Sequence, residues 1–161
     1  MSEQIIKDLS SGIKGVLTHL EPMKAVKDLT PDNARKKPEN KYHSCWELLH
    51  HTVYWQDILL KNLEGKIIDW SKISNEDNWP SDEYLSKDEN FIELVKKFNK
   101  NLEIAASKLE KIDLMKSIKI GPERTPDVTY FRLFLVFLQH TSYHLGQMVT
   151  TRKFLGDWKE D

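Results

Sequence analysis

Two histidines, His140 and His144, stand four residues apart in a long apolar stretch near the C-terminus. Residues at i and i+4 of an α-helix project from the same face, so two such imidazoles can share one divalent metal ion. Leucine, valine and phenylalanine residues occupy the same stripe, which predicts that the pair faces the core. The alternative is a pair of unrelated core or surface histidines, because this spacing occurs more often without a metal than with one.

A third ligand has to come from another helix, and the stretch 45–64 offers His50 and His51. Adjacent residues of a helix point about 100° apart, so only one of the two can face the centre. His51 shares its stripe with apolar residues, whereas His50 lines up with Asp57 and Lys61. We therefore predict that His51 faces inward and that His50 faces solvent.

Three neutral imidazoles on two helices would bind a divalent metal, zinc or nickel, and leave coordination positions open to water or substrate. An open position allows activation of a bound water or thiol, as in a hydrolase or a thiol S-transferase. Glu47 and Gln147 lie within a turn of the predicted ligands and are candidates for orienting an imidazole through its second nitrogen. Cys45 is either a nucleophile activated by the helix dipole or a small buried thiol beside Trp46.

The remaining histidines and the tryptophans have simpler interpretations. His19 and His43 have no ligand partner in the sequence and are interpreted as ordinary histidines. Aromatic residues at helical spacing belong to a core more often than to a binding site. The alternative is that four tryptophans roof a substrate pocket: Trp46, Trp55, Trp70 and Trp79.

Four long helices are predicted to position these residues, because apolar residues recur with helical spacing and no strand-like alternation is convincing. Ser44 with Glu47, and Ser86 with Glu89, have the spacing of capping boxes that open the second and third helices. The predicted helices span residues 3–20, 45–64, 86–111 and 125–156, and a short helix is expected to begin at the Thr30–Pro31 pair.

This pattern predicts an all-α protein in which residues 1–161 form one domain, an up-down-up-down four-helix bundle. The first-to-second and second-to-third connections are expected to be long, because prolines punctuate one and a polar stretch forms the other. The fourth helix is apolar around much of its circumference, at Phe131, Phe134, Leu135 and Leu138, which predicts a homodimer.

Composition narrows the class of partner. Lysine plus arginine count 24 against 25 aspartate plus glutamate, so nothing favours nucleic acid or an anionic membrane, and the expected partner is small. The single cysteine excludes an internal disulfide, and neither a transmembrane-length apolar stretch nor a signal-peptide pattern is present, which predicts a cytoplasmic protein. No glycine-rich phosphate loop and no G-x-S-x-G motif is present.

Two stretches, "SCWELLHHTVYWQDILLKNLEG" and "QHTSYHLGQMVTTRKFLGDW", resemble the DinB/YfiT-like superfamily of small bacterial metal-binding four-helix proteins. In that family a Trp/Glu-rich helix supplies one histidine and an H-x-x-x-H-x-G-Q helix supplies two. The resemblance implies metal ligands at His51, His140 and His144, a homodimer, and use of a low-molecular-weight thiol such as bacillithiol, mycothiol or glutathione. Two functions stay open: an enzyme that transfers such a thiol to an electrophile, and a non-catalytic metal-binding or structural dimer in which the metal holds two helices together.

Overall fold

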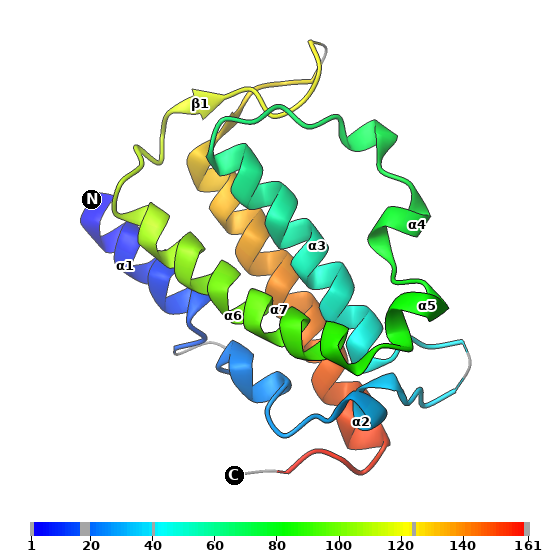
Figure 1. The fold of residues 1–161 in the computed structure, drawn as a ribbon. Coiled ribbons are helices and arrows are strands. Elements are labelled where there is room, and N and C mark those ends of the chain that lie inside the picture. The colour runs from blue at the N-terminus through cyan, green and yellow to red at the C-terminus, as the bar shows by residue number, and fades with distance from the viewer. Residues whose placement is uncertain (1, 17–19, 40, 124, 160–161) are drawn as a thin grey trace.

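The structure is a computed structural model that describes residues 2–16, 20–39, 41–123 and 125–159. The chain is mostly helical, so the predicted all-α class is confirmed. Four long helices pack together, as Figure 1 shows. They are α1 (Ser2–Ile13), α3 (Cys45–Leu63), α6 (Asp88–Leu109) and α7 (Tyr130–Phe154).

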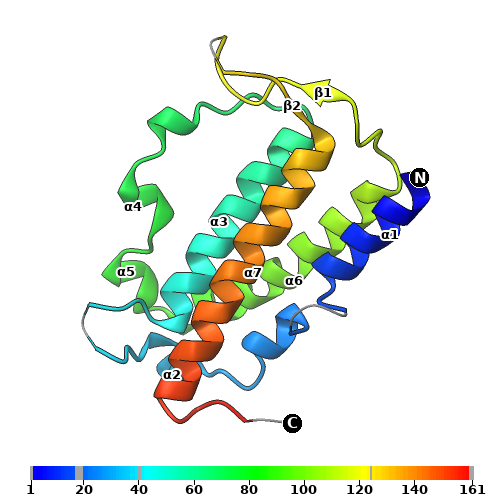
Figure 2. The same cartoon turned by 180° about the vertical axis from the view of Figure 1, so that it is seen from behind.

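Helix α3 packs against both α6 and α7. Going forward along α3, its contacts fall on progressively earlier residues of α7. Near its start, the Cys45 sulfur lies 3.6 Å from the carbonyl oxygen of Met148. Further along, the Gln56 amide donates to the Thr141 hydroxyl at 3.1 Å. The two helices are therefore antiparallel, as Figure 2 also shows, and they can place side chains opposite one another along their length.

Helices α3 and α6 are parallel. Trp46 near the start of α3 packs on Phe91 near the start of α6, and Glu64 after α3 pairs with Lys108 at the end of α6. The predicted up-down-up-down order is therefore wrong for this pair. The physical reason is the predicted long connection, residues 64–87, which runs back along α3 before α6 begins (Figure 1). It carries three short helices: η2 (Trp70–Lys72), α4 (Asn75–Asn78) and α5 (Asp82–Leu85).

The start of α3 matches its predicted capping box. The Glu47 backbone N–H donates to the Ser44 hydroxyl at 3.2 Å, and the Ser44 backbone N–H donates to the Glu47 carboxylate at 2.7 Å. Gly65, at φ +80°, follows the end of the helix. Thr30 caps the short helix α2 (Pro31–Arg35), also as predicted, and η1 (Pro22–Ala25) precedes it. These local signals fix where α3 begins and ends.

Other boundaries differ from the prediction. Helix α1 ends at Ile13 rather than Leu20, because Gly15 adopts φ +74° and a Cβ there would lie 2.4 Å from the Leu20 carbonyl oxygen. His19 lies outside the described residues. The Ser86 hydroxyl donates to the Glu83 carbonyl at the end of α5, so it does not cap α6, which begins after Lys87 without a side-chain cap.

A short hairpin precedes α7. Strands β1 (Ser117–Ile118) and β2 (Val128–Thr129) pair antiparallel, although the sequence showed no convincing strand. Two-residue strands are too short to produce a detectable alternation. Helix α7 consequently begins at Tyr130 rather than near residue 125, with the Thr129 hydroxyl accepting from the Arg132 N–H at 3.2 Å. Its end agrees with the prediction, since Gly156 has φ +70°.

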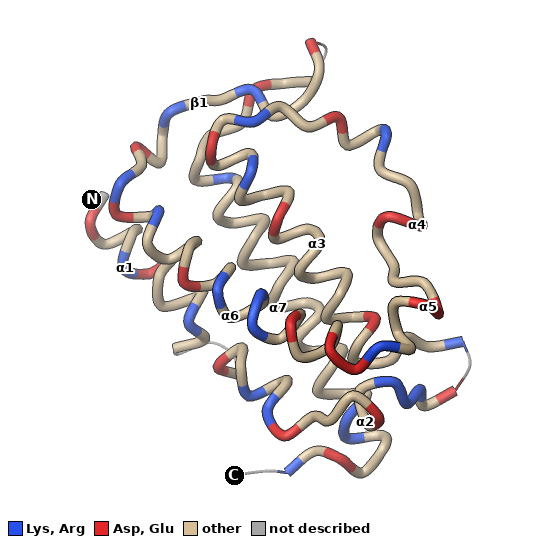
Figure 3. Tube along the Cα trace, in the orientation of Figure 1, with Lys and Arg blue, Asp and Glu red and all other residues tan. Residues whose placement is uncertain are grey.

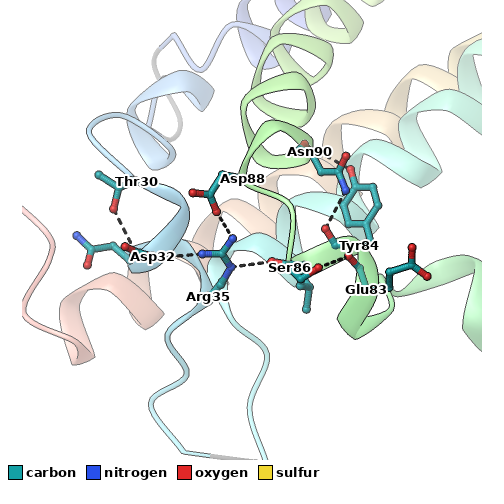
Figure 4. Close-up of polar contacts among 10 residues, drawn as sticks. Thr30, Asp32, Arg35, Glu83, Tyr84, Ser86, Asp88 and Asn90 are labelled. Carbon is teal, nitrogen blue, oxygen red and sulfur yellow. Dashed lines mark hydrogen bonds and ion pairs between the residues drawn. The ribbon is translucent and has the colours of Figure 1, made fainter.

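Arg35 joins α2 to the beginning of α6 (Figure 4). Its guanidinium donates to the Leu85 carbonyl at 2.7 Å and forms ion pairs with Asp32, at 2.9 Å, and with Asp88. It also lies 4.8 Å from the ring centroid of Trp46, a fully buried residue of α3. This Arg35 cluster holds the end of the long connection, and therefore α5, against α3.

Both charge signs occur along α1, α6 and the connecting segments, as the backbone trace in Figure 3 shows. This distribution agrees with the balanced composition. None of the helices in the described ranges combines the length and apolar character needed to cross a bilayer.

Candidate metal centre

Three histidines meet between α3 and α7. The Nε2 atom of His140 lies 3.3 Å from Nε2 of His51 and 3.2 Å from Nε2 of His144. Within the described part of the chain, these three form a group whose potential ligand atoms all lie within 4.8 Å of one another. The structure thus brings together the three residues that were predicted from two distant stretches of sequence.

The spacing of these nitrogens fits a single metal ion. Nitrogen ligands about 2.0–2.1 Å from a tetrahedral zinc ion are about 3.3 Å from each other, and the two Nε2 separations are 3.3 and 3.2 Å. A single proton on Nε2 of His140 can serve only one of its two neighbours. A divalent cation would accept the lone pairs of all three atoms at once.

Burial keeps the three imidazoles neutral. Together with the nearby His144, burial lowers the pKa of His51 to about 4 and that of His140 to about 3. Burial also lowers the pKa of His144, although the hydrogen bond to Gln147 opposes this shift. Neutral imidazoles carry a free lone pair, and deprotonated ligands are a requirement for metal binding.

Gln147 orients one imidazole of the centre, as predicted. Its Oε1 atom lies 2.6 Å from Nδ1 of His144, which places the His144 proton on Nδ1 and leaves the Nε2 lone pair directed at the centre. The Gln147 amide donates in turn to the Tyr143 hydroxyl at 3.3 Å. Glu47 does not have this role, because its carboxylate caps α3 and pairs with Lys37 at 2.7 Å.

Aromatic rings cover the centre. Trp79, in the long connection, stacks on His51 with ring centroids 4.4 Å apart, and His43 stacks on Trp79 at 3.7 Å. Trp55 of α3 meets His140 edge to face at 6.3 Å. Trp79 and Trp55 therefore lie against the centre, as the roof alternative for the tryptophans expected. The contribution of His43 was missed, because no spacing rule links a connecting segment to a helix that it crosses. Of the other two tryptophans, Trp70 packs on Trp55 and Trp46 belongs to the core.

His50 does not face solvent, contrary to the prediction. It is half-buried, its ring meets Tyr84 of α5 edge to face at 5.0 Å, and its burial lowers its pKa. The long connection covers this side of α3, which helical spacing alone marked as exposed. His50 lies outside the three-histidine group.

Cys45 matches the buried-thiol interpretation, and the activated-nucleophile alternative is wrong. The residue is 1% exposed, and burial raises the pKa of its thiol to about 12. Desolvation of a thiolate therefore outweighs any help from the helix N-terminus. At neutral pH the group is a protonated thiol packed against α7.

The model of one protein family, the DinB superfamily, matches residues 22–148, which include all three histidines of the centre. No curated protein and no solved structure matches the chain at a significant level. The matched region extends from η1 almost to the end of α7 and covers more than half of the sequence. Together with the helical fold that carries the centre, this match shows that the chain belongs to the DinB superfamily.

Proposed function

We propose that this protein is a metal-dependent enzyme in which His51, His140 and His144 bind one zinc or nickel ion. The main support is that the group contains three ligands and no fourth histidine, cysteine or carboxylate from the described residues. Structural zinc sites normally have four protein ligands, whereas catalytic sites have three and keep a position for water or substrate. The proposed reaction transfers a low-molecular-weight thiol, of the bacillithiol type, to an electrophile.

A bound divalent ion would favour the thiolate form of the substrate and so increase its reactivity at neutral pH. The thiol proton goes to solvent, the sulfur forms a bond to the electrophilic carbon, and the leaving group departs with the electron pair of its bond. In this reaction Gln147 keeps the Nε2 lone pair of His144 available. Trp79 and Trp55 hold His51 and His140 in place and limit the access of water to them.

The test begins with the metal content of protein purified without added metal. The metal-loaded protein is then assayed with bacillithiol, mycothiol and glutathione and with chlorodinitrobenzene as a general electrophile. Turnover is expected with at least one thiol, is expected to be lost in His140→Ala, and is expected to persist in His50→Ala. A fully loaded protein that is inactive with every thiol contradicts the proposed reaction.

The alternative is a non-catalytic dimer in which the metal joins α3 to α7, and the origin of the ligands on two packed helices favours it. The homodimer itself stays a prediction. Two of the residues that suggested it have internal roles: Phe134 is fully buried, and Leu138 packs so closely on α1 that a Cβ at Gly12 would lie 2.8 Å from it. Bound metal and melting temperature, measured together, separate the enzyme from the structural alternative.

A further inference from the structure

A pocket of about 640 Å³ lies beside the metal centre, between the segment before α3 and the C-terminal half of α7. Three aromatic side chains on its wall are unusually exposed for their size: Tyr42 at 51%, Tyr143 at 64% and Phe154 at 74%. Large apolar groups that gather around one concave surface mark a binding site more often than isolated exposed residues do. The volume falls in the range of about 300–1,000 Å³ that is typical of sites for small molecules.

The pocket wall is directly connected to the centre. Gln147 and Tyr143 both line the pocket, and the Gln147 amide donates to the Tyr143 hydroxyl at 3.3 Å. The other end of the same Gln147 side chain lies 2.6 Å from Nδ1 of His144. A molecule in the pocket would therefore be separated from a metal ligand by one side chain.

The electrostatics of the pocket favour an uncharged occupant. Among the described residues that line it, Glu39 supplies the carboxylate and Lys41 the ammonium group, and these two pair with each other at 3.0 Å. Most of the remaining wall is apolar, aromatic or hydroxyl-bearing. A charged ligand would lose hydration here without gaining an unpaired counter-charge, whereas a flat apolar ring gains contacts with the aromatic wall.

We infer that this pocket binds the uncharged aromatic part of a small-molecule substrate of the metal centre. The inference rests on the proposed function, because it assigns the substrate of that centre. It adds a class of ligand, an uncharged aromatic compound, and names Tyr42, Tyr143 and Phe154 as the residues that recognise it.

The first experiment tests the pocket without any metal. The metal-free full chain is titrated with N-phenyl-1-naphthylamine, an uncharged aromatic probe whose fluorescence increases in apolar surroundings. Phe154→Ala and Tyr143→Ala should each weaken binding by about tenfold, because each removes one aromatic contact with the probe. The matched control is Met115→Ala, which removes a side chain that is 70% exposed and lies outside the pocket. Circular dichroism verifies that the variants are folded.

The second experiment links the pocket to the centre. The chain is loaded with Co²⁺, and its visible absorption bands are recorded as the probe is added. A shift of these bands is expected, because the occupied pocket changes the position of Gln147 and hence of His144. Failure of Co²⁺ to bind would contradict the proposed metal centre, whereas the metal-free titration would still test the pocket.

Three outcomes overturn the inference. The first is equal probe binding by the wild type, Phe154→Ala and Met115→Ala. The second is probe binding that leaves the Co²⁺ bands unchanged, which would make the pocket independent of the centre. The third is absence of probe binding together with a dimer that Phe154→Ala converts to a monomer in sedimentation, which would assign the surface to a second copy of the chain.

Discussion

The Arg35 cluster and the three-histidine centre both join distant segments of the chain, and they differ in how well their polar atoms are satisfied. The Arg35 guanidinium has the Leu85 carbonyl and two carboxylates as acceptors. In the centre, by contrast, three Nε2 atoms face one another. The Nδ1 atoms of His51 and His140 are buried without a hydrogen-bond partner among the described residues.

This difference separates a structural cluster from a binding site. A buried polar group without a partner costs about 1–3 kcal/mol, and folded proteins contain few of them. The Arg35 guanidinium has its acceptors and can be explained by stability alone, although Nε1 of the Trp46 ring that it covers is buried without a partner among the described residues. In the centre, three Nε2 atoms converge and a single proton on His140 can serve only one neighbour, so a cation that accepts all three lone pairs is the simplest explanation for the arrangement.

The largest effect is expected at the centre. His140→Ala should abolish tight metal binding, because two imidazoles rarely hold a divalent ion against water. The melting temperature of the metal-free protein should change by less than about 4 °C, which is roughly 1 kcal/mol for a chain of this size. Elemental analysis and calorimetry on the same sample measure both quantities. Full metal occupancy in the variant would falsify the three-histidine centre. A variant that loses its metal and is much less stable than the metal-loaded wild type would favour the structural alternative.

At the Arg35 cluster we expect the reverse, a loss of stability without a loss of bound metal. Arg35→Ala should lower the free energy of unfolding by about 2 kcal/mol, because it removes the bond to the Leu85 carbonyl, two ion pairs and the contact with Trp46. Urea denaturation measures this change. The neighbouring exposed Lys36→Ala should change stability by less than about 0.5 kcal/mol. Loss of bound metal in a folded Arg35→Ala sample would show that the two clusters are not independent.

A smaller effect is expected for the residue that orients His144. Gln147→Leu keeps a side chain of similar size but removes the acceptor for Nδ1, so metal affinity should fall by about tenfold. Competition with a chromophoric chelator measures the affinity. The control is the same substitution at Gln139, an exposed residue of the same helix. Equal affinities for the two variants would mean that Gln147 does not tune the centre.

The smallest effect concerns Cys45, a buried thiol that has a carbonyl contact. Burial raises its pKa from 9.0 to about 12, so the stability gained from the protonated thiol is complete below pH 9 and is lost as the pH rises through 12. Native protein should therefore react very slowly with iodoacetamide at pH 8, whereas protein unfolded in guanidinium should react readily. Mass spectrometry measures the extent of labelling. Rapid labelling of the native protein would contradict the assigned burial.

The ligands of the candidate centre were accessible to sequence reasoning because the relevant geometry is local. The four-residue spacing of His140 and His144 places both on one helix face, and the apolar stripe that His51 shares predicts its inward direction on the helix that the Ser44–Glu47 capping box opens. The role of Gln147 follows from the same helical spacing, since it lies three residues after His144. Each of these statements depends only on a few neighbouring residues.

The sequence by itself therefore determined the helical class, the ends of α3 and the three histidines that meet. Only the tertiary structure decided the parallel arrangement of α3 and α6, the burial of His50 beneath Tyr84, and the stacking of Trp79 on His51. All three depend on the path of residues 64–87 across the surface of α3. That path is set by contacts between residues far apart in the chain, such as Arg35 with Asp88, and helical periodicity carries no information about such contacts.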